Sequence, residues 1–244
     1  MSRIFDDLAA EEEALEAVLS GLPERAWLGP SAAAGWSVAD VVLHLAQTEE
    51  RIPVALSGVD PMGAARGDER GTDELMDVLV RSERAAPAEV FARWRSGRRR
   101  ALEALRHADP RVPVPWVAAE LKPPTLATTR LAEHWAHALD VTIPLGIDYP
   151  DTDRLRHVAW LGHGTLRYAF ALAGMPAHDV YCELTAPDGA IWRFGPPEAA
   201  SSIRGTAAAF CRVGAQRLAP AASGLVAAGP HGAAALQLLR NYAG

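Results

Sequence analysis

The chain has 244 residues, with 24 Lys and Arg against 30 Asp and Glu, a net charge of −6 and 49% apolar residues. These values are typical of a water-soluble folded protein and exclude a disordered or disulfide-stapled chain, while the mildly acidic balance excludes nucleic acid as the main partner. The longest uncharged stretch, Leu218 to Leu239, is interrupted by Pro and Gly, so it cannot form a membrane helix. The chain has only two cysteines, Cys182 and Cys211, and no signal peptide, so we expect it to be located in a reducing cytoplasm.

Residues 4 to 173 follow a helical pattern, because apolar residues recur at three- and four-residue steps. Helices are expected at residues 4–21, 37–52, 72–83, 87–105, 125–143 and 151–173. A capping box from Ser37 to Asp40 begins the second helix, and Pro53 is expected to end it. Two segments lack helical periodicity. The Gly-rich stretch 58–71 is expected to form a loop that borders a site, and the Pro-rich stretch 110–124 is expected to form a connector.

After Gly174 the pattern changes to short strands. Residues 180–184 and 190–194 have β-forming sequences, and the Pro-Asp-Gly turn between them predicts a hairpin. A helix is expected at 206–217, a third strand at 225–228 and a last helix at 233–242. We therefore expect a mainly α protein, with a four-helix-type bundle in residues 1–174 and a small α+β domain with a short antiparallel sheet in residues 175–244.

Three side chains form a candidate metal site. Glu133 and His137 are four residues apart in the expected helix 125–143, so both project from one face, along which Arg130 and Asp140 also lie. His44 lies in the middle of the second helix, which a bundle can bring opposite that face. A His, Glu, His set with a vacant fourth position suits catalytic zinc, and nickel or ferrous iron accept the same ligands. By spacing alone, a surface Glu/His pair and a core histidine remain the commoner interpretation.

Two separated motifs resemble one family. The run from Gly35 to Leu45, GWSVADVVLHL, resembles the GWSVxDVxxHL opening of the DinB-like metal-binding bundles, in particular the mycothiol-dependent maleylpyruvate isomerase family. The run from Thr129 to Val141, TRLAEHWAHALDV, resembles the second ligand helix of that family, which has a Glu, three residues, a His, two residues and an Asp. Residues 184–195 and 204–217 are similar to the small C-terminal domain of the family. The resemblance covers most of the chain and implies a DinB-like bundle followed by that domain.

The resemblance also implies a ligand set. His44, Glu133 and His137 would bind zinc or another divalent ion. His134 departs from the family pattern, because it places an extra imidazole beside Glu133; it is expected either as a partly exposed flank residue or as a competing ligand. Asp140, one turn beyond His137, is expected to accept a hydrogen bond from a ligand imidazole and so orient it.

Two arginines are candidates for catalytic contact. Arg98 falls on the apolar stripe of its helix between Trp94 and Ala101, where it either reaches inward to a carboxylate of substrate or thiol, or extends its guanidinium to the surface. Arg217 ends the helix after Gly205, and the resemblance implies that it is directed toward the active site. Pairing with the carbonyl groups at the end of its own helix is the alternative.

The resemblance implies an enzyme that uses the thiol mycothiol against an electrophilic small molecule. A single lysine among the basic residues indicates a GC-rich genome, which is compatible with an actinobacterial source where mycothiol occurs. A metal-coordinated thiol loses its proton readily and becomes a strong nucleophile. Cys182 and Cys211 are expected to be buried packing residues, which fits the use of an external thiol.

Several reactions fit such a site. Addition of the thiolate leads either to isomerisation, after bond rotation and loss of the thiol, or to S-transfer, in which the adduct is kept. Within the same class, a hydrolase that uses zinc-activated water remains open. The alternative from a different class is a non-catalytic protein that binds an apolar small molecule or lipid and has a structural or vestigial metal site. The sequence names neither the substrate nor an oligomeric state.

Overall fold

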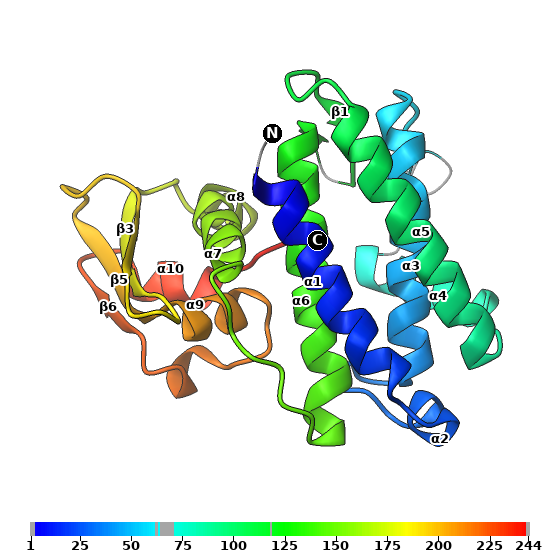
Figure 1. The fold of residues 1–244 in the computed structure, drawn as a ribbon. Coiled ribbons are helices and arrows are strands. Elements are labelled where there is room, and N and C mark those ends of the chain that lie inside the picture. Colours follow the sequence, from blue (N-terminus) through cyan, green and yellow to red (C-terminus); the bar gives the residue numbers. More distant parts are fainter. Residues whose placement is uncertain (1–2, 62, 64–70, 118, 243–244) are drawn as a thin grey trace. The chain divides into compact units, whose positions relative to one another are not determined.

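A computed structural model describes residues 3–61, 63, 71–117 and 119–242. Its contacts divide the chain into two units, one that ends at Tyr149 and one that begins at Pro150 (Figure 1). Helices dominate, as expected for a mainly α protein. Within the described residues, no helix combines the length and the apolar character that crossing a membrane requires.

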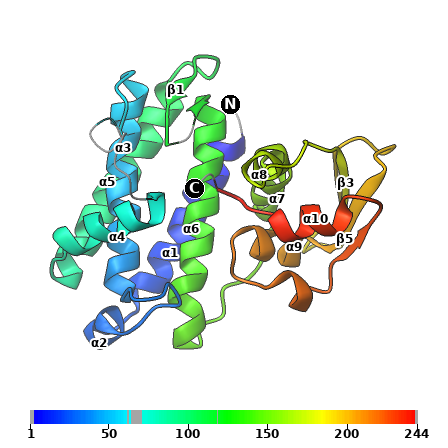
Figure 2. The ribbon, with the colours of Figure 1, turned by 180° about the vertical axis from the view of Figure 1, so that it is seen from behind.

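The first unit is a four-helix bundle. Its long helices are α1 (Arg3–Ser20), α3 (Val38–Leu56), α5 (Pro87–His107) and α6 (Pro123–Leu145). Helix α1 packs against α5 and α6, and α3 packs against the same two helices, so the four surround one core (Figures 1 and 2). The core side chains with almost no exposed surface are Leu8, Leu15, Leu43, Leu45, Ile52, Trp94, Leu105, Leu126 and Leu131.

Local sequence explains where α3 and α6 begin and end. The Ser37 hydroxyl accepts from the Asp40 backbone N–H at 3.1 Å, and the Asp40 carboxylate accepts from the Ser37 N–H at 2.9 Å, which confirms the capping box. The expected end of α3 before Pro53 was wrong, because the helix continues to Leu56. A proline in the last turn of a helix removes few backbone hydrogen bonds. Helix α6 likewise includes Pro144 in its last turn, and it ends before Gly146, which has a φ of 65°.

Short elements complete the first unit. Helix α2 (Glu24–Leu28) was not predicted, and α4 (Thr72–Ser82) lies close to its expected position. The proline-rich connector contains a two-residue hairpin of β1 (Val114–Pro115) and β2 (Glu120–Leu121). Most of the expected loop 58–71 lies outside the described residues.

The second unit joins a sheet to short helices. Strands β3 (Val180–Thr185) and β4 (Ile191–Phe194) form the expected antiparallel hairpin, and β6 (Val226–Ala228) pairs antiparallel with β5 (Ser201–Thr206). The sequence did not indicate β5, which pairs parallel with β3, so the order is β4-β3-β5-β6. Helix α9 (Ala207–Gly214) contacts β3 and β5. A 3-10 turn, η1 (Pro220–Ala222), precedes β6, and α10 (Gly232–Leu238) follows it.

The expected helix 151–173 is divided in two, α7 (Leu155–Gly164) and α8 (Leu166–Leu172). Helix α7 packs against α9 and β4, so it belongs to the second unit. Gly162 allows close packing here, because a Cβ there would lie 2.5 Å from the Oδ1 atom of Asn241 and 3.3 Å from the Phe210 ring of α9. The division of the chain after Tyr149 therefore precedes the boundary expected after Gly174, since helical periodicity does not reveal which core a helix covers.

Candidate metal centre

His44 of α3 converges with Glu133 and His137 of α6. The Nε2 atom of His44 lies 3.5 Å from the Glu133 Oε2 atom, and the His137 Nε2 atom lies 3.5 Å from the same oxygen. The imidazole rings of the two histidines are 5.0 Å apart between centroids. One donor atom from each of the three side chains lies within 4.8 Å of the other two.

These three donors fit a divalent ion. Zinc bonds to nitrogen and oxygen of about 2.0–2.2 Å imply that ligand atoms at tetrahedral positions lie roughly 3.3–3.6 Å apart, which matches the 3.5 Å separations of Glu133 from both imidazoles. The Nδ1 atom of His44 is buried and has no hydrogen-bond partner among the described residues, so this ring meets the other two side chains through its Nε2 atom. The Glu133 side chain is 31% exposed, which leaves one side of the set open.

Asp140 holds the His137 ring in place. Its buried carboxylate accepts a hydrogen bond of 2.9 Å from the Nδ1 atom of His137. With the proton on Nδ1, the lone pair of Nε2 faces Glu133 and is available to an ion. The expected role of Asp140 toward a ligand imidazole is thus supported by its contact.

The charged partners shift the pKa values of the three candidate ligands in different directions. Burial lowers the pKa of His44 from 6.5, against the opposing hydrogen bond with Glu133. Burial also opposes the charged forms of His137 and Glu133, but hydrogen bonds outweigh it. Those with Asp140 and Glu133 raise the pKa of His137, and those with the two imidazoles hold the pKa of Glu133 well below 4.5.

In the metal-free protein, we expect His137 to titrate above pH 6.5 and His44 below it. The folded state holds the His137 proton more tightly than the unfolded chain. His137 therefore stabilises the metal-free fold below pH 6.5, and this contribution is lost as pH rises through the raised pKa. NMR titration of the imidazole resonances measures both values, and the reverse order of titration would contradict the assignment of Asp140 as the partner of His137.

We expect Asp140→Ala to weaken zinc binding by about 10–100-fold, because the His137 ring loses the acceptor that fixes its tautomer. Asp140→Asn keeps an acceptor oxygen without the charge, so its loss should be smaller. Competition with a chelator of known affinity measures both. Unchanged zinc affinity in Asp140→Ala would show that the contact does not orient the ligand.

Trp36 and α4 form a wall beside His44. The Trp36 ring lies 5.3 Å from the His44 ring between centroids, and its Nε1–H donates to Asp77 Oδ1 of α4 at 2.9 Å. Arg84, after α4, makes a two-pronged ion pair with Asp40 of α3, with both contacts at 2.8 Å. Contacts from Asp77 in the middle of α4 and from Arg84 just after it therefore connect α4 to the region around the His44 ring.

His134 is not the partly exposed flank residue that was expected. Its side chain is fully buried, and burial lowers its pKa to about 3. The ring makes hydrogen bonds at both nitrogens: Nε2 accepts from the Trp94 indole N–H at 3.1 Å, and Nδ1 donates to the Arg130 carbonyl at 2.9 Å. It lies in a separate cluster with Glu12 and Glu49. With both nitrogens occupied, His134 has no lone pair to offer to an ion at Glu133.

Arg98 fits neither of its two expected roles. The side chain is buried rather than extended to solvent, and its guanidinium pairs with Glu12 and Glu16 of α1. It also lies over the Trp94 ring, 5.2 Å from the centroid. Since two carboxylates of the protein already hold this guanidinium, we exclude Arg98 from the candidate centre.

Arg130 has a role that its place on the ligand face did not reveal. Its Nε donates to Glu49 Oε1 at 2.7 Å and its Nη2 to Thr48 Oγ1 at 2.8 Å, and the three side chains are buried. Arg130 lies one turn before Glu133 on α6, and Thr48 lies one turn after His44 on α3. This Arg130 clamp therefore joins the two helices that carry the candidate ligands. The signal in the sequence was the position of Glu49, a charged residue on the buried face of α3.

Arg217 lies in the second unit, three residues after α9. It is half-buried, and its Nη1 donates to the Ala215 carbonyl at 2.6 Å. That contact agrees with the alternative of pairing near the end of its own helix, and its approach to the active site stays a prediction.

Comparisons with known proteins show relatives and a common fold. Two uncharacterized proteins of Mycobacterium tuberculosis, MT0041 and Rv0036c, are each 34% identical to the chain over 252 residues, and each match covers 98% of this chain and 94% of the relative. The crystal structure of the mycothiol-dependent maleylpyruvate isomerase and that of a histidine-to-alanine mutant are similar with TM-scores of 0.62. Both share 14% identity, and each match covers 93% of this chain and 92% of the other, which shows a common fold.

A family model matches residues 8–142, more than half of the chain. This range includes His44, Glu133, His137 and Asp140, together with the Arg130 clamp. The model describes the mycothiol maleylpyruvate isomerase N-terminal domain. The chain belongs to that family.

Proposed function

We propose that the protein is a metal-dependent enzyme that uses mycothiol to attack an electrophilic small molecule, with isomerisation or S-transfer as the outcome. The observation that carries the proposal is the convergence of His44, Glu133 and His137 at zinc-like spacing, with an open side at Glu133. A bound divalent ion would supply a Lewis acid that lowers the pKa of a thiol at the open position.

Each side chain of the proposed centre has a different role. His44 and His137 offer neutral imidazole nitrogens, and Glu133 offers the single negative charge of the set. Because this set cancels only one charge of a divalent ion, the centre keeps an attraction for an anionic thiolate. Asp140 orients His137, and the Arg130 clamp sets the distance between α3 and α6.

The cysteines of the chain support an external thiol. Cys182 and Cys211 are fully buried, and Cys211 lies 3.6 Å from the Leu155 carbonyl. Burial raises the pKa of Cys182 to about 12 and that of Cys211 further. Both thiols are therefore poorly suited to form a thiolate near neutral pH, which supports a diffusible molecule as the nucleophile.

The reaction follows from the chemistry of a thiolate. Its sulfur adds to one carbon of an electron-poor double bond, which becomes a single bond and rotates. Loss of the same thiolate restores the double bond in the other geometry, which is isomerisation, whereas protonation of the adduct gives S-transfer. Maleylpyruvate, named for the enzyme of similar fold, is the first substrate to assay.

Calorimetric titration with mycothiol tests the proposal. We expect zinc-loaded protein to bind mycothiol more tightly than metal-free protein, and the difference should grow as pH rises toward the thiol pKa, because less free energy is then needed to remove the proton. Cys182→Ser and Cys211→Ser are controls that should leave this behaviour unchanged. Equal affinities with and without zinc would remove the proposed role of the metal and favour a non-catalytic binding protein.

A further inference from the structure

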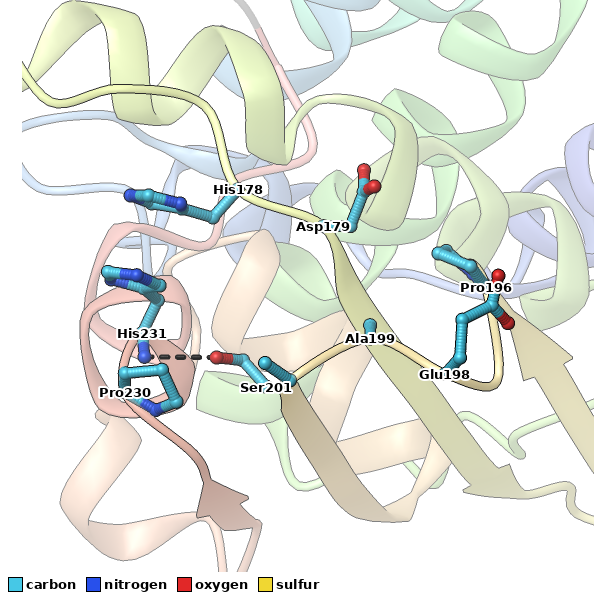
Figure 3. A pocket seen from close by; sticks show the side chains of 9 residues that line it. His178, Asp179, Pro196, Glu198, Ala199, Ser201, Pro230 and His231 are labelled. Carbon is cyan, nitrogen blue, oxygen red and sulfur yellow. Dashed lines mark hydrogen bonds between the residues drawn. The ribbon is translucent and has the colours of Figure 1, made fainter.

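One group of titratable side chains outside the candidate metal centre borders a cavity of about 360 Å³ in the second unit (Figure 3). The imidazole rings of His178 and His231 lie one above the other there, with centroids 3.4 Å apart and planes that differ by 4°. Their nitrogens therefore point in parallel and do not converge on one ion. The Asp179 carboxylate at the same cavity already binds Arg167 at 2.8 Å. A buried group in the bundle has a more informative arrangement.

Two glutamates meet in the core of the bundle. The side chains of Glu12 on α1 and Glu49 on α3 have no exposed surface, and a carboxylate oxygen of each lies within 4.8 Å of one from the other. Helices α1 and α3 each pack against α5 and α6, so these carboxylates approach each other across the core (Figure 1). Two negative charges at this separation repel strongly, because water does not screen them. The fold is therefore favoured when one of the two is neutral.

Each of the two side chains also has one oxygen without a partner. The Oε1 atom of Glu12 and the Oε2 atom of Glu49 are buried and make no hydrogen bond to any described residue. Two ionised carboxylates cannot satisfy each other, because both only accept hydrogen bonds. A protonated carboxyl has an O–H group that donates to a carboxylate oxygen. A single proton therefore gives both buried groups a partner.

The neighbouring guanidinium groups show which glutamate holds the proton. Arg130 of α6 donates to Glu49 at 2.7 Å, whereas Arg98 of α5 approaches Glu12 only to 3.5 Å and pairs more closely with Glu16. Burial and the charge of Glu49 raise the pKa of Glu12 well above 4.5, against the weaker opposing effect of Arg98. Burial raises the pKa of Glu49 as well, but its contact with Arg130 opposes this. Glu12 is thus the carboxyl that is harder to ionise.

Other polar and charged groups around the pair have their own partners. Arg95 of α5 binds Glu16 at 2.7 Å, and Glu11 of α1 accepts a hydrogen bond of 2.6 Å from the Tyr149 hydroxyl. His134 of α6 has hydrogen bonds at both ring nitrogens. These contacts add no further cation beside the two buried glutamates.

We propose that Glu12 is protonated at neutral pH and donates a hydrogen bond to Glu49, which joins α1 to α3 across the core and makes the bundle sensitive to alkaline pH. The unfolded chain releases this proton near the ordinary pKa of 4.5, whereas the folded protein keeps it. The contribution of Glu12 to stability is therefore complete below pH 4.5 and declines as pH rises toward the raised pKa. The pair stands independently of the proposed metal and thiol chemistry.

Infrared spectroscopy of the full-length, metal-free protein tests for the proton directly. In protein labelled with ¹³C-glutamate, we expect the carbonyl band of a protonated carboxylic acid at neutral pH, and we expect Glu12→Gln to lose it. Glu13→Gln, at the exposed neighbour on α1, is the matched control and should keep the band. Absence of the band from the unsubstituted protein would overturn the proposal, and so would a band that persists in folded Glu12→Gln.

The pH dependence of stability provides a second measurement. The amide of Glu12→Gln donates to Glu49 as the protonated carboxyl does, but it does not ionise. Its folding equilibrium constant relative to that of the unsubstituted protein should therefore rise with pH. The rise should reach up to about tenfold per pH unit above the ordinary pKa of 4.5, and it should stop where the folded protein itself releases the proton. Urea unfolding at several pH values measures this ratio, and a constant ratio would show that Glu12 ionises in the fold as it does in the unfolded chain.

Discussion

We expect His44→Ala and His137→Ala each to lower the number of tightly held divalent ions by one per chain. Each substitution removes one of three donors from a set in which the remaining two cannot enclose an ion. His134→Ala should destabilise the fold, because the Trp94 indole N–H loses its acceptor in the core, yet it should keep the ion. Elemental analysis after zinc loading and gel filtration compares the three variants.

The comparison between these variants separates ligand loss from unfolding. Circular dichroism and thermal melts show whether each variant remains folded. If His134→Ala loses the ion while still folded, the wrong imidazole has been assigned to the centre. If His44→Ala retains it, α3 contributes no ligand.

Breaking the Arg130 clamp is expected to destabilise the bundle strongly. The guanidinium and the Glu49 carboxylate are buried, so Arg130→Met leaves a buried carboxylate without its partner, at a cost of about 3–5 kcal/mol in the free energy of unfolding. The double variant Arg130→Met/Glu49→Leu removes both charges and should recover much of the loss. Urea unfolding of the metal-free protein measures each value. A cost below about 1 kcal/mol for Arg130→Met would show that the pair does not hold the helices together.

Arg98 provides a matched control for the effect of the Arg130 clamp on the metal. Its buried guanidinium pairs with Glu12 and Glu16 and connects α5 to α1, neither of which carries a candidate ligand. Arg98→Met should therefore destabilise the fold without changing zinc affinity in the folded protein. Thr48→Val, which removes one hydrogen bond of the clamp with little change of shape, should weaken zinc binding while the protein stays folded. Equal effects of the Arg98 and Thr48 changes on zinc affinity would mean that the clamp does not position the ligands.

Much of the bundle could be predicted because its signals are local. The capping box from Ser37 to Asp40 and the four-residue spacing of Glu133 and His137 each lie within one or two helical turns. The hairpin turn ending at Gly189, where φ is 86°, depends on three consecutive residues. The position of α3 opposite α6 could be predicted only from the family resemblance, because helical spacing does not determine which helices are neighbours.

The features that escaped prediction depend on contacts distant in the sequence. The buried position of Arg98 was visible in its apolar stripe, but its partners lie more than eighty residues away on α1. Strand β5 contains Ser and Gly in place of a clear alternation, and its pairing with β3 requires a crossover. Glu12 shows what signal was available, since it follows Leu8 by four residues and precedes Leu15 by three, on the buried face of α1. A charge in that position predicts a buried partner.

X-ray absorption spectroscopy of the protein loaded with one equivalent of zinc tests most directly whether the thiol meets the metal at this centre. Without mycothiol, the zinc should have only nitrogen and oxygen neighbours, because both cysteines of the chain are buried in the second unit. On addition of mycothiol, one sulfur neighbour should appear at about 2.3 Å and should be absent in the His44→Ala variant. An unchanged nitrogen and oxygen shell, at a mycothiol concentration that saturates the protein, would contradict the proposed function.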